Sequence, residues 1–304
     1  FKIEKECETS DHPIAFQSIL GDIRDKPLLH RLFSSFKPDV VFHAAAYKHV
    51  PMQEKHPWEA VLTNIQGTLN LIDAAEDYSV DRFVLVSTDK AVNPSNIMGA
   101  TKHIAEKLIH TKSYDSKVNY MAVRFGNVIG SSGSVIPTFQ DQIKKGGPVT
   151  ITDPNMQRYF MSISEAAQLI LQAGALGKGG EIYVLDMGDP VNIKDIAYEL
   201  IRLSGLEPEK DITIDYIGSR PGEKMYEELK SKSESMVETI HEKIFMLKNE
   251  KNISWPQMMD IASEIIKTSK SYNFNEIFKS LSKYIPSLKS DSFIYESEKV
   301  KRNQ

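Results

Sequence analysis

The chain has 304 residues, of which 41% are hydrophobic and 26% are charged, and its formal net charge is −4. This composition predicts a globular protein with a large core, and the negative charge argues against nucleic-acid binding, which normally needs a basic face. A single cysteine, Cys7, excludes an intrachain disulfide and a cysteine-rich metal site, and we expect no metal centre. No apolar run approaches the roughly 18 residues of a membrane span, so we expect no membrane contact from this sequence itself.

Strand-like and helix-like segments alternate along the first half of the chain. This alternation is typical of βαβ units, and it predicts an α/β fold with a doubly wound parallel sheet. We expect strands at residues 15–20, 39–43, 83–86 and 120–124, and helices at residues 58–76 and 97–110.

The pattern changes after residue 130. Gly146-Gly147-Pro148 interrupts the chain, and we expect a smaller, substrate-binding lobe over the carboxyl edge of the sheet, with core segments interleaved through residues 131–247. Residues 248–304 are polar and predict a partly helical, then disordered tail. The expected elements of the middle part are strands at 149–152, 181–186 and 212–217 and helices at 162–175, capped by Ser162, and at 193–203.

A hydroxyl, a carboxylate and an ammonium group follow the apolar strand at residues 83–86. They belong to Thr88, Asp89 and Lys90, at the strand end where ligands collect in open α/β sheets. Together they provide a hydrogen-bond donor, an acid or base and a proton carrier. We therefore predict a reactive site there. Met98 and Lys102 lie four residues apart on the next helix and share a face, although alone they would suggest core filling and a surface charge.

Candidate nucleotide contacts follow the two preceding strands. Asp22 suits the adenine amino group in a dinucleotide-binding fold, but an aspartate there also suits a helix cap. Ala44, Ala45 and Ala46 let the backbone approach a ligand or let a helix pack tightly. Lys48 adds a cation at the same edge.

The chain lacks the Gly-x-Gly-x-x-Gly phosphate loop of dinucleotide-binding folds. Either no dinucleotide binds, or the first βαβ unit has been removed. The second interpretation fits a chain that starts in charged residues without an initiating methionine. Residues 1–130 would then be a dinucleotide-binding domain that lacks its first βαβ unit. Two arginines in turns of the second lobe, Arg158 and Arg220, suit diphosphate oxygens or a solvated surface.

Five stretches within residues 13–247 together resemble the extended short-chain dehydrogenase/reductase group. More narrowly, they resemble the nucleotide-sugar 4,6-dehydratases of bacterial polysaccharide and glycan biosynthesis that act on UDP-N-acetylglucosamine. The matching stretches are His43–Pro51, Ser87–Pro94, Asn96–Lys102, Arg124–Val128 and Arg220–Lys224.

The resemblance implies a Rossmann-like fold, a tightly held NAD cofactor and a UDP-sugar substrate. NADP stays open because the strand that carries the discriminating residue is missing. We also expect a homo-oligomer. The implied cofactor contacts are Asp22, Ile23, Ala44, Ala45, Ala46 and Lys102, and the implied substrate contacts are Lys48, Asn127, Arg158 and Arg220.

The implied reaction converts UDP-N-acetylglucosamine to UDP-2-acetamido-2,6-dideoxy-4-keto-hexose through transient hydride transfer. Thr88 is assigned to the 4-hydroxyl, Lys90 to removal of the carbon-5 proton, and Asp89 to protonation of the departing 6-hydroxyl. Lys102 is assigned to the nicotinamide ribose.

Met98 stands where most of the superfamily has tyrosine, and a thioether has no proton to exchange. A branch of the dehydratases with membrane-anchored amino-terminal regions resembles this sequence in carrying methionine there. We therefore expect a cytoplasmic enzyme tethered to the inner face of the plasma membrane by a region absent from this sequence.

Two alternatives stay open at this point. A UDP-sugar 4-epimerase of the same superfamily would need only the hydride steps, and the pair Asp89-Lys90 favours elimination over it. A non-catalytic nucleotide-binding relative would suit Met98 and the missing phosphate loop, but it would have little use for the Thr-Asp-Lys cluster.

Overall fold

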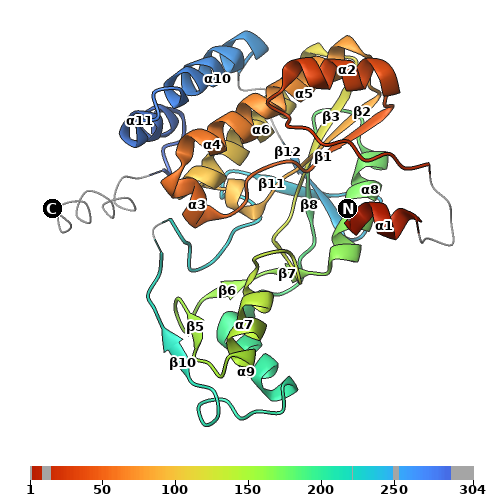
Figure 1. The fold of residues 1–304 in the computed structure, drawn as a ribbon. Helices are drawn as coiled ribbons and strands as arrows, with labels where there is room; N and C mark the ends of the chain where they lie inside the picture. The colour runs from red at the N-terminus through yellow and green to blue at the C-terminus, as the bar shows by residue number, and fades with distance from the viewer. Residues whose placement is uncertain (1, 9–14, 221, 249–252, 289–304) are drawn as a thin grey trace.

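The computed structural model describes residues 2–8, 15–220, 222–248 and 253–288. Within these residues, a six-stranded sheet with the order β1-β2-β3-β8-β12-β11 forms the centre (Figure 1). The strands β1, β2, β3 and β8 run parallel, whereas β12 and β11 are antiparallel to their neighbours. The strands are β1 (Val40–His43), β2 (Arg82–Val86), β3 (Asn119–Arg124), β8 (Ile182–Leu185), β11 (Ser235–Glu238) and β12 (Ile244–Lys248).

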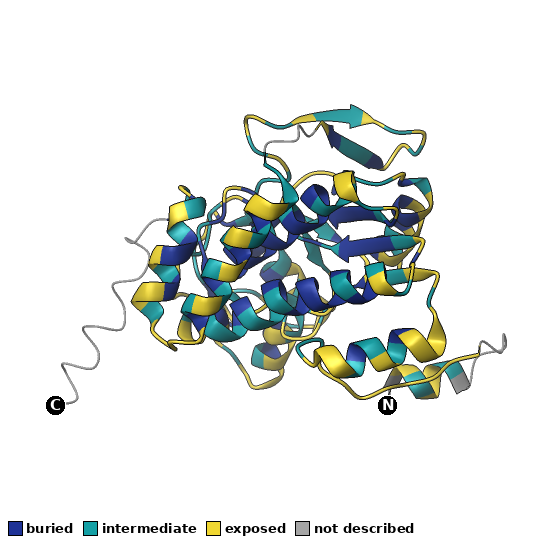
Figure 2. Cartoon of the chain, turned by 90° about the horizontal axis from the view of Figure 1, so that it is seen from above, coloured by how far each residue is buried: buried dark blue, intermediate teal, exposed yellow. Residues whose placement is uncertain are grey.

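Helices cover both faces of the sheet, as the apolar character of its central strands requires. Successive side chains of a strand point to opposite faces, and accordingly Phe83 and Leu85 pack in one core cluster and Val84 in another. Figure 2 shows the buried residues gathered between the layers. The larger cluster lies under α2 (Lys26–Phe36), α4 (Pro57–Val61), η1 (Leu62–Gly67), α5 (Thr68–Asp77) and α6 (Ile97–Lys112), and the other lies under α8 (Ile163–Leu176).

A smaller lobe with its own core lies at one end of the sheet (Figure 1). Its helices α7 (Val135–Lys144) and α9 (Ile193–Leu203) pack beside the parallel pair β5 (Val149–Ile151) and β10 (Ile214–Tyr216). The predicted α/β fold with a doubly wound sheet and a smaller lobe is thus confirmed. The remaining elements are α1 (Lys2–Glu8), α3 (Val50–Lys55), η2 (Asp89–Ala91), η3 (Ser113–Asp115), β4 (Asn127–Val128), β6 (Gln157–Arg158), β7 (Phe160–Met161) and β9 (Val191–Asn192).

The strand predicted at residues 15–20 is wrong. These residues are exposed and irregular, and Leu20 is fully exposed. A strand needs a neighbour to pair its backbone groups, and among the described residues β1 pairs only with β2. Residues 15–20 therefore remain outside the sheet.

Residues 248–304 are expected to form a polar, partly helical tail, and their described part contains α10 (Trp255–Ser269) and α11 (Phe274–Tyr284). Their buried residues, among them Met258, Ile265 and Leu281, join the larger core cluster. α10 and α11 pack against α4, and α10 also packs against α6. The predicted disorder at the chain end falls on residues 289–304, which lie outside the described residues. None of the helices in the described ranges is long and apolar enough to cross a membrane.

Candidate active site

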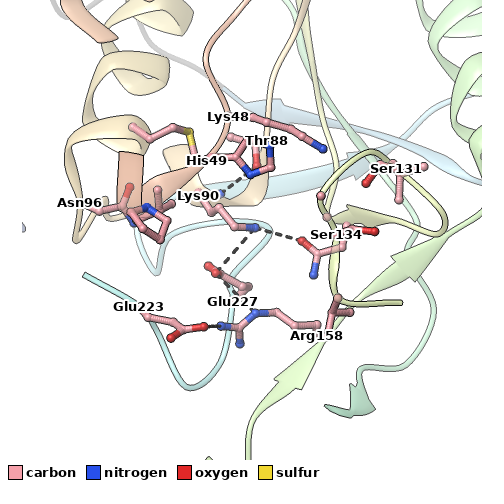
Figure 3. A pocket seen from close by; sticks show the side chains of 18 of the residues that line it. Lys48, His49, Thr88, Lys90, Asn96, Ser131, Ser134, Arg158, Glu223 and Glu227 are labelled. Atoms are coloured by element: carbon pink, nitrogen blue, oxygen red, sulfur yellow. Dashed lines mark hydrogen bonds and ion pairs between the residues drawn. The ribbon is translucent and has the colours of Figure 1, made fainter. Parts of the chain in front are cut away.

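A cavity of about 580 Å³ opens between the carboxyl ends of the parallel strands and the smaller lobe (Figure 3). The loops after β1, β2 and β3 contribute to its wall, as expected at the carboxyl edge of an α/β sheet. Ten of the predicted site residues line it: Ala44, Ala46, Lys48, Thr88, Lys90, Met98, Lys102, Asn127, Arg158 and Arg220.

Thr88, Asp89 and Lys90 lie at a tight 3₁₀ turn directly after β2. The Thr88 hydroxyl donates a hydrogen bond to Asp89 Oδ1 at 2.9 Å, and Lys90 Nζ donates to the same oxygen at 2.9 Å. The Asp89 side chain has no exposed area and does not line the cavity. Its carboxylate therefore reaches the cavity only through Thr88 and Lys90.

Lys90 faces a second carboxylate, that of Glu227. No motif in the sequence identified Glu227. Lys90 Nζ donates to Asn127 Oδ1 at 3.1 Å and lies 3.7 Å from Glu227 Oε1. Burial disfavours the charged ammonium, but Asp89 and Glu227 outweigh burial and raise the pKa of Lys90. Lys90 is therefore an ammonium at neutral pH in the ligand-free site.

Arg158 crosses the cavity from the smaller lobe and holds the segment around Glu227. Its Nη2 donates to Lys224 O at 2.7 Å and its Nη1 to Met225 O at 3.0 Å. It also lies 3.8 Å from carboxylate oxygens of both Glu223 and Glu227. Most of its donors are thus engaged by the protein, whereas Arg220 is exposed at the rim.

Helix α6 presents Met98 and Lys102 to the cavity, so the predicted common face is confirmed. The helix begins after Asn96, whose Oδ1 accepts from Gly99 N at 2.8 Å. A Cβ at Gly99 would lie 2.2 Å from Lys90 O, so only glycine lets the helix approach the 3₁₀ turn so closely.

Lys102 is buried, and its Nζ donates to Val86 O at 2.7 Å. Burial lowers the pKa of Lys102 to about 8, although Glu106 opposes this effect. An ammonium has three donors, and among the described residues only this one hydrogen bond is formed. The remaining donors are available to a ligand in the cavity.

Small residues and the remaining donors of Lys102 make this part of the wall one that could hold a sugar of a dinucleotide. Ala44 and Ala46 provide a small-residue wall, and Val86 and Lys102 close the cavity beside them. Three other predicted cofactor residues, Asp22, Ile23 and Ala45, do not line the cavity. The Asp22 carboxylate instead binds Arg24 at 2.6 Å.

Two comparisons with known sequences show the family of the chain. A family model described as polysaccharide biosynthesis protein matches residues 1–249. The capsular polysaccharide biosynthesis protein CapD of Staphylococcus aureus is 54% identical over 247 residues, which are 81% of this chain and 41% of CapD. A UDP-glucose 4-epimerase of Rickettsia canadensis is 40% identical over 220 residues, which are 71% of this chain and 62% of the epimerase. The chain thus spans less than half the length of CapD.

Solved structures define the class. Pen from Bacillus thuringiensis matches with a TM-score of 0.75 at 35% identity, and the match covers 86% of each chain. Further structures with this fold include a nucleotide-sugar epimerase and a dehydratase with NAD bound. The fold is that of a Rossmann-like extended short-chain dehydrogenase/reductase. Within that class, the chain belongs to the polysaccharide biosynthesis protein family, and the resemblance in its motifs is confirmed at that level.

Proposed function

We propose that this chain carries the active site of a nucleotide-sugar 4,6-dehydratase that acts on UDP-N-acetylglucosamine. The observation that carries the proposal is the joined cluster of Thr88, Asp89 and Lys90 at the wall of a cavity that also contains Lys102. Elimination of water needs a base and an acid close together, and this cluster holds a carboxylate beside an ammonium.

We propose NAD as the cofactor, without excluding NADP. Ala44, Ala46 and Lys102 would hold its nicotinamide-ribose end, and Asp22, Ile23 and Ala45 stay predicted contacts for the rest of the molecule. When bound, NAD would supply the hydride acceptor for carbon 4 and the hydride donor for carbon 6. The Lys102 ammonium would bind the ribose hydroxyls and stabilise negative charge beside them.

The chain's own residues would perform the proton transfers. The Thr88 hydroxyl binds the 4-hydroxyl of the sugar and would relay the proton that this group loses on oxidation to the Asp89 carboxylate. Lys90 in its neutral form removes the carbon-5 proton. Asp89 would then return the proton taken from the 4-hydroxyl to the departing 6-hydroxyl, again through the Thr88 hydroxyl to which it is bonded. Met98 takes part only as an apolar wall, since a thioether exchanges no proton.

Substrate contacts come from four residues around the cavity. Arg220 and Lys48, both exposed at the rim, would bind the diphosphate. Asn127 would bind a sugar hydroxyl, since its side chain lies beside Lys90. Arg158 would contribute through the segment around Glu227 that it holds.

The second candidate is a UDP-sugar 4-epimerase, favoured by the 40% identity to the Rickettsia epimerase. The two activities differ in mass balance, so incubation of the full-length gene product with UDP-N-acetylglucosamine separates them. The dehydratase product lacks one water by mass spectrometry, and deuterated solvent labels carbon 5. An epimerase product with unchanged mass would refute the dehydratase proposal, and binding without turnover would indicate the non-catalytic alternative.

We also propose that the full-length protein is a homo-oligomer tethered to the inner face of the plasma membrane. CapD extends well beyond the stretch matched here, which leaves room for a tether. Membrane fractionation and light scattering of the full-length protein test these two points.

A further inference from the structure

Glu227 occupies the wall of the cavity between two cations (Figure 3). Its Oε1 lies 3.7 Å from Lys90 Nζ and 3.8 Å from Arg158 Nε, and its side chain is 4% exposed. It comes from the irregular segment between β10 and β11, far from Lys90 in the sequence. The assignments made so far give it no part in the reaction.

The second oxygen of this carboxylate, Oε2, is buried without a hydrogen-bond partner among the described residues. An unpartnered charged oxygen in such a position is costly, and protonation of the carboxyl group removes much of that cost. Burial raises the pKa of Glu227, and Asp89 adds to this effect, whereas Lys90, Arg158 and Lys224 oppose it. Glu227 is therefore well placed to accept a proton.

Lys90 has two carboxylates within reach, and they differ in their contacts. Asp89 Oδ1 already accepts hydrogen bonds at 2.9 Å from both Thr88 and Lys90, and its Oδ2 is also buried without a partner among the described residues. Glu227 has no hydrogen bond from Lys90, only the longer ion-pair contact. Glu227 lines the cavity beside Lys90 and its pKa is raised by burial, whereas Asp89 does not line the cavity and is already assigned to the departing 6-hydroxyl.

We propose that Glu227 takes up the proton that Lys90 must lose before it can act as a base on the sugar. The inference rests on the proposed function, in which Lys90 removes the carbon-5 proton. In this step one N–H bond of the Lys90 ammonium breaks and one O–H bond forms on the Glu227 carboxylate. The proton moves from Lys90 to Glu227, so the net charge of the two side chains together is unchanged. Bound sugar displaces water from the cavity. The loss of water disfavours the charged pair of Lys90 and Glu227 and so favours the proton transfer.

The test uses the full-length gene product with its cofactor and the substitution Glu227→Gln. Glutamine keeps the shape of the side chain but accepts no proton. We expect reduction of the bound cofactor by the sugar to change less than about threefold, because hydride transfer from carbon 4 precedes the use of Lys90. Water loss and deuterium exchange at carbon 5 should both fall by about 10²- to 10³-fold, the usual contribution of a proton-transfer group. The remaining activity should rise with pH, since Lys90 must then lose its proton to solvent.

Two comparisons make the result specific. Glu228→Gln makes the same change one residue further on, where the carboxylate contacts Lys224 and Asn93 rather than Lys90, and it should retain dehydration. Glu227→Asp should restore part of the activity. In wild-type protein, substrate binding should also add a protonated-carboxyl band to the infrared difference spectrum, and Glu227→Gln should remove this band.

Three results would overturn the role of Glu227: full dehydration by Glu227→Gln, an equal loss of cofactor reduction and dehydration, or an infrared band that persists in the variant. A wild-type protein that turns over the sugar without water loss would instead refute the proposed function. The wild-type product and the behaviour of the variant therefore test the two proposals separately.

Discussion

Glu106→Gln tests the buried ion pair between Glu106 and Arg124, which lies beside the strand ends that carry the site. Arg124, at the end of β3, binds Glu106 of α6 through two contacts, at 2.7 Å and 3.1 Å. Both side chains are 2% exposed, and Ser87 donates a third hydrogen bond to the carboxylate at 2.6 Å. Removing one member of such a pair leaves the other charge buried and unpaired, which costs about 3–5 kcal/mol.

Arg124 retains a weaker partner in the variant, because Glu234 lies 3.3 Å away. We therefore expect the lower end of this range, about 3 kcal/mol, which for a domain of this size is a fall in Tm of roughly 6–12 °C. Glu199→Gln is the matched control, since Glu199 pairs with Arg202 in an exposed position. The control should lose less than about 1 kcal/mol. Thermal and urea unfolding measure both.

The pH dependence of stability provides a second measurement. Burial raises the pKa of Glu106, but Arg124 and Ser87 outweigh it, so the folded-state pKa lies below the ordinary value of 4.5. A depressed carboxyl pKa contributes stability above pH 4.5 that is lost as the pH falls through the folded-state value. Glu106→Gln should remove this contribution. The reasoning would be refuted if Glu106→Gln were as stable as Glu199→Gln and lost stability at acid pH in the same way as the wild-type protein.

Three further predictions concern single side chains. Burial lowers the pKa of Lys102 to about 8, so cofactor affinity should weaken as the pH rises through that value. Lys102→Met should bind the cofactor weakly at every pH. Titration with the cofactor at several pH values measures both effects. Met98→Leu should retain dehydration at above about a third of the wild-type rate, because the thioether exchanges no proton; turnover assays check this. Leu281→Ala should cost about 2–5 kcal/mol in unfolding experiments, because Leu281 of α11 is fully buried in the main core.

The sequence predicted the central part of the site because local patterns and topology agree there. The apolar run at residues 83–86 predicts a strand, so Thr88 and Lys90 were expected at its carboxyl end. Met98 and Lys102 share a helix face by spacing alone. The helix expected at residues 97–110 is likewise local, and the structure has it as α6.

Tertiary pairing decides the parts that the sequence did not reveal. Residues 15–20 precede the turn at Gly21 and were expected to form a strand, but pairing with a neighbour decides whether a strand forms. Glu227 lies in a segment without regular structure, and its importance depends on its contact with Lys90, which is far away in the sequence. The helix at residues 274–284 did carry a signal: Phe274, Ile277, Phe278 and Leu281 recur at helical spacing, although the segment is polar on average.

Asp89→Asn separates catalysis from binding, because Asp89 touches the proposed proton relay and not the cavity itself. Asparagine keeps the shape and still accepts a hydrogen bond from Thr88, but it has no acidic proton to supply. Water loss should be abolished, whereas UDP-sugar affinity should stay within about threefold, since the proposed binding residues lie on other segments of the wall. Mass spectrometry of the product and calorimetric titration with UDP-N-acetylglucosamine measure the two effects. Full dehydratase activity in the variant would remove Asp89 from the mechanism and would leave Glu227 as the only other carboxylate in contact with Lys90 among the described residues.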